Sequence, residues 1–227
     1  MSDERCLDVS TDRLRRHFIL GLAASTLAGL CLGTTQASAQ GSTPTILVLG
    51  DSLSAEYGLA RGTGWVALLE KRLADEKVAA SVVNASVSGD TTSGGRARLP
   101  ALLNKHKPAV VVIELGGNDA LRGLPMKNTQ DNLAAMVQAA QKAGAKVLLV
   151  GMQVPPNYGS DYARRFAAAF GEVARQHQTA LVPFLLEGVA NGPDAASLFQ
   201  PDRIHPNAQA HPMMLGNVWP ALRKLLR

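Results

Sequence analysis

Short, solidly apolar segments alternate along the chain with longer segments in which apolar residues recur every three or four positions. The first pattern is typical of buried strands and the second of helices with one apolar face. The apolar runs predict five strands, at residues 46–49, 80–85, 110–115, 147–150 and 181–182. The periodic segments predict five helices, at residues 65–73, around 99–103 with an end near Pro108, at 129–143 with a stop at Gly144, at 160–177, and from 207 onward with a bend or interruption at Pro212 and Pro220.

This alternation of strands and helices defines the expected fold class. Strands that are apolar at every position must be buried on both faces, and strands separated by helices run parallel. We therefore expect an α/β domain in which a central parallel sheet of about five strands is covered on both faces. The sequence after residue 40 shows no internal linker or repeat that would divide this domain.

The first 39 residues have the organisation of an export signal. An arginine-containing start precedes an apolar run at 18–33, and Ala37-Ser38-Ala39 forms a small-x-small cleavage site. We expect cleavage near Gln40, a domain that comprises residues 40–227, and a periplasmic or secreted protein. Arg15-Arg16 also resembles a twin-arginine signal. A retained membrane anchor stays an alternative, although the apolar run is short for a span of ~20 residues.

The composition of the chain argues against several kinds of functional site. Both cysteines, Cys6 and Cys31, lie in or before the signal, so the mature chain is expected to have no disulfide, no cysteine nucleophile and no cysteine-based metal site. The five histidines are scattered and lack the close spacing of a metal site. The formal charge of +5 is spread along the chain without a basic stripe. This distribution argues against nucleic-acid binding and leaves at most peripheral contact with an anionic membrane.

Polar residues that can take part in catalysis or ligand binding follow the predicted strands. Ser52 comes shortly after the first strand, Gly89 after the second and Asn118 after the third, while Asp202 and His205 lie in the last loop. The carboxyl ends of parallel strands meet at one edge of the sheet, where α/β proteins bind ligands. We therefore expect these five residues to form one site.

The same five residue types fit nucleophilic catalysis. His205 can take the proton of Ser52, and Asp202, three residues earlier, can accept the other ring N–H and fix the tautomer. The N–H groups of Ser52 and Gly89 and the side-chain amide of Asn118 can stabilise a developing oxyanion. The pattern thus predicts a serine nucleophile with its base and its oxyanion donors.

Other interpretations of single residues stay open. Ser52 can instead cap the following helix, and His211 can be the base, although it has no aspartate three residues before it. Asp51, Asp90 and Asp119 are interpreted as acceptors of backbone N–H bonds in turns. Glu114 is an acidic residue inside an apolar strand, where a carboxyl group must be paired or protonated. We expect Glu114 to bond the neighbouring strand-end loops and to hold Asn118 in position.

Together these motifs resemble the four blocks of the SGNH (GDSL-type) hydrolases, which carry Ser, Gly, Asn and His in this order. Within that family the chain is similar above all to the periplasmic multifunctional thioesterase/lysophospholipase/arylesterase group. The likeness covers essentially the whole predicted mature chain. The matching blocks are Gly50-Asp51-Ser52-Leu53-Ser54, Asn84-Ala85-Ser86-Val87-Ser88-Gly89-Asp90-Thr91-Thr92, Glu114-Leu115-Gly116-Gly117-Asn118-Asp119 and Ile204-His205-Pro206-Asn207.

The resemblance implies a flavodoxin-like three-layer α/β/α sandwich with no metal and no cofactor. It also implies an acyl-enzyme mechanism. In that mechanism Ser52, Asp202 and His205 form the catalytic triad, and Ser52, Gly89 and Asn118 form the oxyanion site.

Further positions bear on the choice of substrate. Glu56 and Arg203 depart from the family pattern, which tends to have a small residue and a glycine there, and a carboxylate at Glu56 is expected to disfavour anionic substrates such as acyl-CoA. A glycine-flanked loop at 116–123 is expected either to move over an acyl chain or to form a rigid connection. The residues expected to line the acyl groove, if they are not simply core, are Leu121, Leu124, Met152, Val154 and Pro155.

We expect from these observations an exported, monomeric serine hydrolase that cleaves acyl ester and thioester bonds of small-molecule substrates. A short-chain deacetylase of carbohydrates or cell-wall polymers on the same scaffold stays an alternative, which a preference for acetyl over long acyl chains would favour. A non-catalytic acyl-lipid-binding protein, or a membrane-tethered lipid carrier, is the alternative from another class. The complete set of triad and oxyanion residues argues against a protein without catalytic activity.

Overall fold

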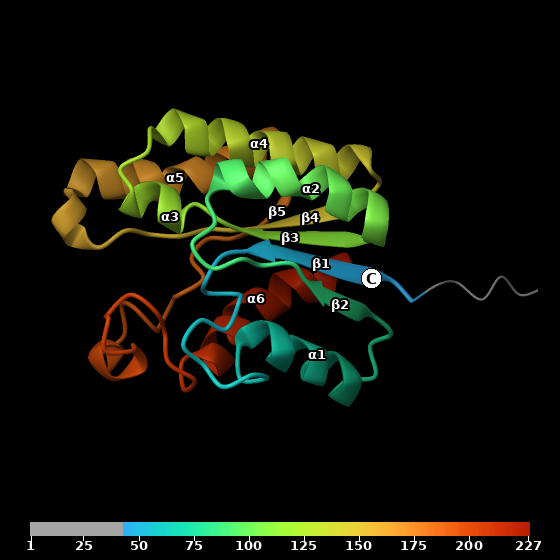
Figure 1. Ribbon diagram of the computed structural model, residues 1–227, viewed down its shortest axis with the longest axis horizontal. Helices are drawn as coiled ribbons and strands as arrows, with labels where there is room; N and C mark the ends of the chain where they lie inside the picture. The colour runs from blue at the N-terminus through green and yellow to red at the C-terminus, as the bar shows by residue number, and fades with distance from the viewer. Residues whose placement is uncertain (1–42) are drawn as a thin grey trace, which may run out of the picture. The chain divides into compact units, whose positions relative to one another are not determined.

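A central sheet of five parallel strands organises the protein, whose computed structural model describes residues 43–227 (Figure 1). The strand order is β2-β1-β3-β4-β5, the flavodoxin-like order. The predicted export signal and both cysteines lie outside the described residues. The α/β fold with its parallel five-stranded sheet is confirmed, and the strands are β1 (Thr45–Gly50), β2 (Ser81–Asn84), β3 (Val110–Glu114), β4 (Lys146–Val150) and β5 (Ala180–Val182).

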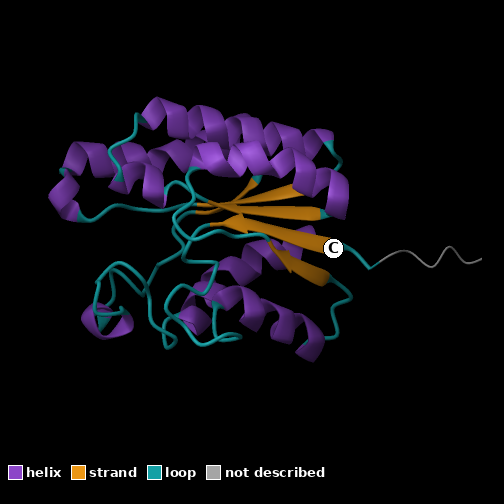
Figure 2. Ribbon diagram, viewed as in Figure 1, coloured by secondary structure: helices purple, strands orange, loops and turns teal. Residues whose placement is uncertain are grey.

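Helices cover both faces of this sheet, as Figures 1 and 2 show. The helices α1 (Trp65–Asp75) and α6 (His211–Leu225) pack together on one face. The helices α2 (Thr92–His106), α4 (Met126–Lys142) and α5 (Ser160–Gln176) cover the other. None of the helices between residues 43 and 227 has the length and apolar character that a membrane span requires.

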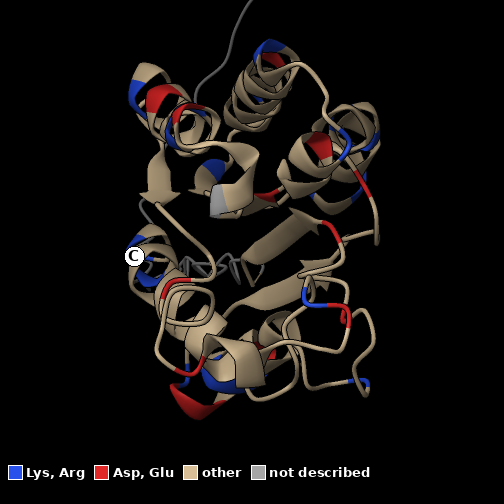
Figure 3. Cartoon of the chain, turned by 90° about the vertical axis from the view of Figure 1, so that its left-hand side faces the viewer, with Lys and Arg blue, Asp and Glu red and all other residues tan. Residues whose placement is uncertain are grey.

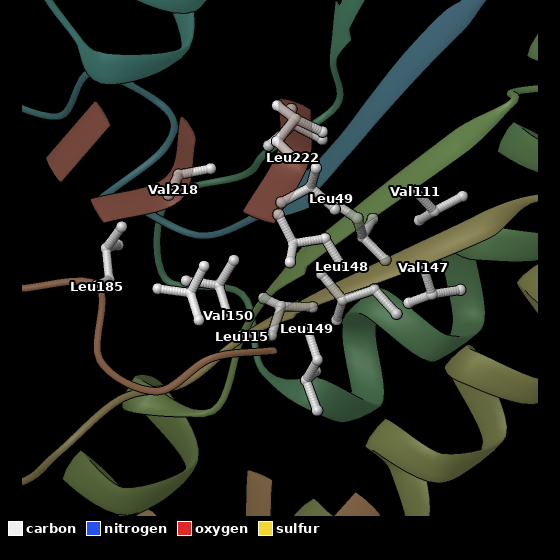
Figure 4. Packing of buried hydrophobic residues seen from close by; sticks show 14 of the residues in the cluster. Leu49, Val111, Leu115, Val147, Leu148, Leu149, Val150, Leu185, Val218 and Leu222 are labelled. Carbon is white, nitrogen blue, oxygen red and sulfur yellow. The ribbon is translucent and has the colours of Figure 1, made fainter. Parts of the chain in front are cut away.

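The apolar runs of the sequence form the centre of the molecule. Every residue of β3 is buried, because β1 and β4 flank this strand and helices cover both its faces. Figure 4 shows residues of β1, β3 and β4 packed with Val218 and Leu222 of α6. Fully burying one side chain of this size stabilises a fold by about 1.5–3 kcal/mol. The strands therefore hold their carboxyl ends on a rigid frame.

The end of α4 follows the glycine signal in the sequence. Gly144 has φ +84°, the left-handed conformation that suits glycine. The N–H of Gly144 donates to the carbonyl of Gln141, and the N–H of Ala145 donates to that of Ala140. These bonds satisfy carbonyls at the end of the helix, so the chain turns directly into β4.

Two elements differ from the expectation. The last helix begins at His211 and not at residue 207, because the Asn207 side chain accepts the N–H of Gln209 and its carbonyl accepts the N–H of Ala210 in a separate turn. Pro212 falls in the first turn, where no N–H donor is needed, so the predicted interruption there is wrong. Pro220 lies within the same continuous helix.

The second difference concerns the expected loop at 116–123, which contains a short helix, α3 (Gly117–Leu121).

Strand order reverses between β1 and β3, which are neighbours in the sheet but are separated in the chain by β2. The loops that follow these two strands leave toward opposite faces, and ligands bind at such switch points in open α/β sheets. Ser52 lies in the connection after β1, and Asn118 lies in α3 in the connection after β3. The fold therefore places two of the predicted site residues side by side.

Candidate active site

Ser52 occupies the first turn after β1. The carboxyl ends of the strands face the viewer in Figure 3. Its side chain is half-buried. The turn is held by the neighbouring carboxylate, because the Oδ1 atom of Asp51 accepts the N–H of Leu53 at 3.0 Å. The carbonyl of Asp51 also accepts the N–H of Ala55 at 2.9 Å. These bonds fix the Ser52 hydroxyl at the carboxyl end of the sheet.

A chain of hydrogen bonds connects Ser52 to two residues of the last loop. The Oγ atom of Ser52 lies 3.0 Å from Nε2 of His205. The Nδ1 atom of the same ring lies 2.6 Å from Oδ2 of Asp202. The second carboxylate oxygen of Asp202 accepts the N–H groups of Ile204 and His205. His205, and not His211, is thus the histidine that contacts Ser52.

The electrostatics of Asp202 keep it ionised. The backbone N–H of His205, the imidazole of His205 and the N–H of Ile204 all stabilise the charged form, and they lower the pKa of Asp202 to about 2. An ionised carboxylate at this position favours the tautomer with hydrogen on Nδ1. The Nε2 atom is then free to accept a proton from the Ser52 hydroxyl.

Gln200 ties the loop of His205 to the loop that follows Ser52. Its backbone N–H donates to the carbonyl of His205, and its side-chain amide donates to the carbonyls of Tyr57 and Pro206 at 2.9 and 3.0 Å. The role of Gln200 is not visible in the sequence, because a single glutamine in an aperiodic segment gives no signal of its bonding partners.

Arg203 adopts a backbone conformation that favours glycine, with φ +58°. This is the position at which the family resemblance leads one to expect glycine. The side chain of Arg203 is exposed. The loop therefore keeps the turn between Asp202 and His205 even though a non-glycine residue occupies it.

Three potential oxyanion donors come from the turns after β1 and β2 and from α3, the short helix that follows β3. Among the described residues, neither the N–H of Ser52 nor that of Gly89 has a hydrogen-bond acceptor. Gly89 has φ +79°, and its carbonyl accepts a bond from Arg122 at 2.7 Å. The amide of Asn118 uses one N–H to donate to Oδ2 of Asp51 at 2.9 Å. Its second N–H is available to a ligand.

Glu114 is fully buried, and its contacts differ in part from the expectation. Its Oε2 atom accepts the hydroxyl of Ser54 at 2.6 Å, so it does bond a strand-end loop. The expectation that it holds Asn118 is wrong, because Asp51 accepts the Asn118 amide. Gly50 is required here, since a Cβ atom would lie 2.8 Å from Oε2 of Glu114. Burial raises the pKa of Glu114 well above its ordinary value.

The other two aspartates accept backbone N–H groups in turns, as interpreted from the sequence. Asp119 is buried, and it accepts the N–H of Thr92 at 2.9 Å at the start of α2. Asp90 accepts the N–H of Thr91 and also pairs with Arg98. Both carboxylates thus organise the segments next to Gly89 and Asn118.

Glu56, which departs from the family pattern, forms hydrogen bonds within its own loop. Its carboxylate accepts the N–H groups of Gly62 and Gly64, the latter at 2.7 Å. Gly64 is the N-cap of α1, where a negative charge is favourable. The carboxylate therefore stabilises the entry to α1. Its expected effect on anionic substrates stays a prediction.

The residues expected to line an acyl groove have different environments. Leu121 and Pro155 are exposed, Val154 and Leu124 are half-buried, and Met152 belongs to the hydrophobic core. Their role in binding substrate stays a prediction.

Two aromatic and imidazole contacts were not foreseen. The ring of Tyr57 lies against that of His205, with their centroids 4.4 Å apart. His211 is buried, and its Nδ1 atom accepts the N–H of Trp65 at 3.0 Å, which joins α6 to α1. Burial lowers the pKa of His211.

Within residues 43–227, no three acidic, histidine or cysteine side chains are grouped so as to hold a metal ion.

Comparison with known proteins identifies the family of this chain. The sequence model of the GDSL-like lipase/acylhydrolase family matches residues 48–212. The chain belongs to this family. The family resemblance noted from the four motif blocks is therefore confirmed, and the chain is an ester hydrolase.

Individual members of the GDSL-like family are similar over most of the chain. Esterase TesA of Pseudomonas aeruginosa is 56% identical over 205 residues, which are 90% of this chain and 98% of that protein. Thioesterase 1/protease 1/lysophospholipase L1 of Escherichia coli K12 is 43% identical over 75% of this chain and 79% of its own length. A crystal structure of TesA matches with a TM-score of 0.77 and 58% identity, and covers 80% of this chain and 99% of the solved chain.

Proposed function

We propose that this GDSL-family hydrolase is a serine esterase that cleaves acyl ester and thioester bonds through an acyl-enzyme on Ser52. The observation that carries the proposal is the continuous chain of hydrogen bonds from Ser52 through His205 to Asp202. A free serine hydroxyl is a poor nucleophile at neutral pH, and a base at 3.0 Å removes that limitation.

The proposed reaction has two stages. The Oγ atom of Ser52 attacks the substrate carbonyl while Nε2 of His205 takes its proton, and the resulting imidazolium is stabilised by the ionised Asp202. His205 then gives the proton to the departing oxygen or sulfur, and the Ser52 ester remains. In the second stage a water molecule attacks this ester with His205 again as base, and the carboxylic acid leaves.

The negative charge that develops on the carbonyl oxygen requires preorganised donors. The unoccupied N–H groups of Ser52 and Gly89 and the second N–H of Asn118 are the candidates. Loss of one such donor typically lowers kcat by about 10²–10³-fold. Asp51 fixes the Asn118 amide and thereby reduces the reorganisation that this donor needs during the reaction.

The names of the relatives support the range of substrates. They include an esterase and a thioesterase with lysophospholipase activity in its name. We propose that this chain likewise accepts small-molecule acyl esters and thioesters, with carboxylic acids as products.

Hydrolysis of p-nitrophenyl esters from acetyl to palmitoyl tests the function. The Ser52→Ala variant should lose about 10³-fold or more of the wild-type rate, because the nucleophile is gone while the binding site remains. Ser93→Ala, which removes an exposed serine of α2, is the matched control and should keep the full rate. Undiminished hydrolysis by Ser52→Ala would contradict the mechanism.

The dependence of the wild-type rate on acyl length separates the two enzymatic alternatives. A rate that rises with chain length supports an acyl-lipid esterase. Activity confined to acetyl esters would instead indicate a short-chain deacetylase.

A further inference from the structure

Tyr57 contacts His205 and is also largely exposed to solvent. Its ring lies against the imidazole of His205, with centroids 4.4 Å apart and planes inclined by 39°. Half of the residue's surface, 50%, remains exposed to solvent. One face of the Tyr57 ring is therefore in contact with His205, and a large part of the remainder is available to a ligand.

The backbone around Tyr57 holds this ring in place without burying it. The N–H of Tyr57 donates to the carbonyl of Ser52 at 3.3 Å, and its carbonyl accepts the side-chain amide of Gln200 at 2.9 Å. The residues on either side, Glu56 and Gly58, both have positive φ, of +59° and +71°. Tyr57 is thus fixed to the loop of Ser52 and, through Gln200, to the loop of His205.

The chemistry of the proposed mechanism defines what lies beside His205. In acylation, Nε2 of His205 gives its proton to the leaving group, so the leaving atom must come within about 2.6–3.2 Å of Nε2. The carbonyl oxygen of the substrate must instead face the donors of Gly89 and Asn118. A ring in contact with the imidazole is therefore within reach of a bulky leaving group bound at Nε2.

We propose that Tyr57 is a specificity-determining residue that binds the leaving group, and that it favours flat aromatic alcohols. The proposal rests on the proposed serine mechanism, because that mechanism defines the position of the leaving group. Aromatic rings prefer offset-stacked or edge-to-face contacts with one another, and such pairs contribute beyond their buried area. An aryl leaving group can make such a contact with Tyr57, whereas a short alkyl group cannot.

A purely structural role for Tyr57 makes a different prediction. If the ring served only to orient the imidazole of His205, its removal would slow the alkyl ester at least as much as the aryl ester, because an alkoxide is the poorer leaving group and depends more on the proton from His205. If the ring binds the leaving group, its removal slows aryl esters selectively. Two esters of the same acid separate these roles, since both form the same acyl-enzyme and share the same deacylation step.

The experiment compares phenyl butyrate with ethyl butyrate in the wild type, Tyr57→Leu and Tyr57→Phe. Tyr57→Leu should lower kcat/KM for the phenyl ester by roughly 3- to 10-fold and leave kcat/KM for the ethyl ester unchanged. Tyr57→Phe keeps the ring and should preserve both values. A loss with the ethyl ester that equals or exceeds the loss with the phenyl ester, or no loss with either, would overturn the proposal.

A second measurement covers the case in which Tyr57→Leu does not fold. Phenol should inhibit the wild type competitively and more strongly than cyclohexanol, which has a similar size but no aromatic face. Equal inhibition by the two alcohols would contradict an aromatic contact. Ser52→Ala is assayed in parallel, because its full activity would refute the serine mechanism itself, independently of the result at Tyr57.

Discussion

At the scale of single residues, the carboxyl group beside Ser52 carries an energetic conflict. Asp51 is buried, which raises its pKa to about 6 although the N–H of Leu53 and the amide of Asn118 stabilise its charge. The ionised form is the better acceptor for Asn118, and burial is the reason that it is costly. Ionised Asp51 therefore lowers the stability of the fold at neutral pH while it fixes the Asn118 amide as a donor in the site.

The Asp51→Asn variant tests this conflict through the pH dependence of stability. The native Asp51 retains its proton up to about pH 6, whereas the unfolded chain loses it near 3.8. Between these values the native state binds more protons, so its stability falls as pH rises. We expect the melting temperature of the variant, relative to the wild type, to increase from pH 4 to pH 7.

Asp194→Asn is the matched control for this comparison, because it removes the same charge from an exposed position. Its melting temperature should keep a constant offset from the wild type over the same pH range. Parallel curves for Asp51→Asn as well would contradict the assignment of a raised pKa to Asp51.

Residue positions in the site were predictable where a motif ties them to a strand end. Ser52, Gly89 and Asn118 follow predicted strands, and the three-residue spacing of Asp202 and His205 fits a turn. Asp51 was not identified as the partner of the Asn118 amide, because the sequence does not say which of two nearby acids reaches it. Tyr57 was missed since its direction depends on left-handed turns that have no periodic signal.

At the scale of elements, apolar strands were easy to predict and short or glycine-containing helices were not. The central strands β1, β3 and β4 are buried on both faces, so their apolar signal is continuous. α3 has only five residues between glycines and cannot show a helical period. α2 contains Gly94, Gly95 and Pro100, which obscure its pattern even though its packing is tight.

Two glycine-to-alanine substitutions in helices should change stability in opposite directions. A Cβ atom at Gly95 of α2 would lie 2.3 Å from Cδ1 of the buried Leu115, so Gly95→Ala should destabilise the fold by about 1–3 kcal/mol. A Cβ atom at Gly216 of α6 meets no atom within 4 Å. Gly216→Ala should therefore stabilise by about 0.4–1 kcal/mol, because alanine restricts the unfolded chain.

Urea unfolding of both variants measures these changes, and each serves as the control for the other. A stabilised Gly95→Ala variant would show that Leu115 moves aside without loss, and that α2 does not require close approach to β3.

At the scale of the whole molecule, residues 43–227 contain the sheet, both helical layers and every proposed site residue. We propose that residues 1–39 are an export signal that is removed before the protein acts. N-terminal sequencing of the exported protein should find a start near Gln40. A chain that retains its first residues would instead support a membrane anchor.

The long connection between Ser52 and His205 has a consequence for biosynthesis. The two residues are separated by 153 positions in the chain, yet their side chains are in hydrogen-bond contact. At about 5–20 residues per second, a ribosome needs roughly 8–30 s to proceed from one to the other. During that interval the nascent chain has its nucleophile but no base, so it cannot attack the acyl esters of the cell that makes it.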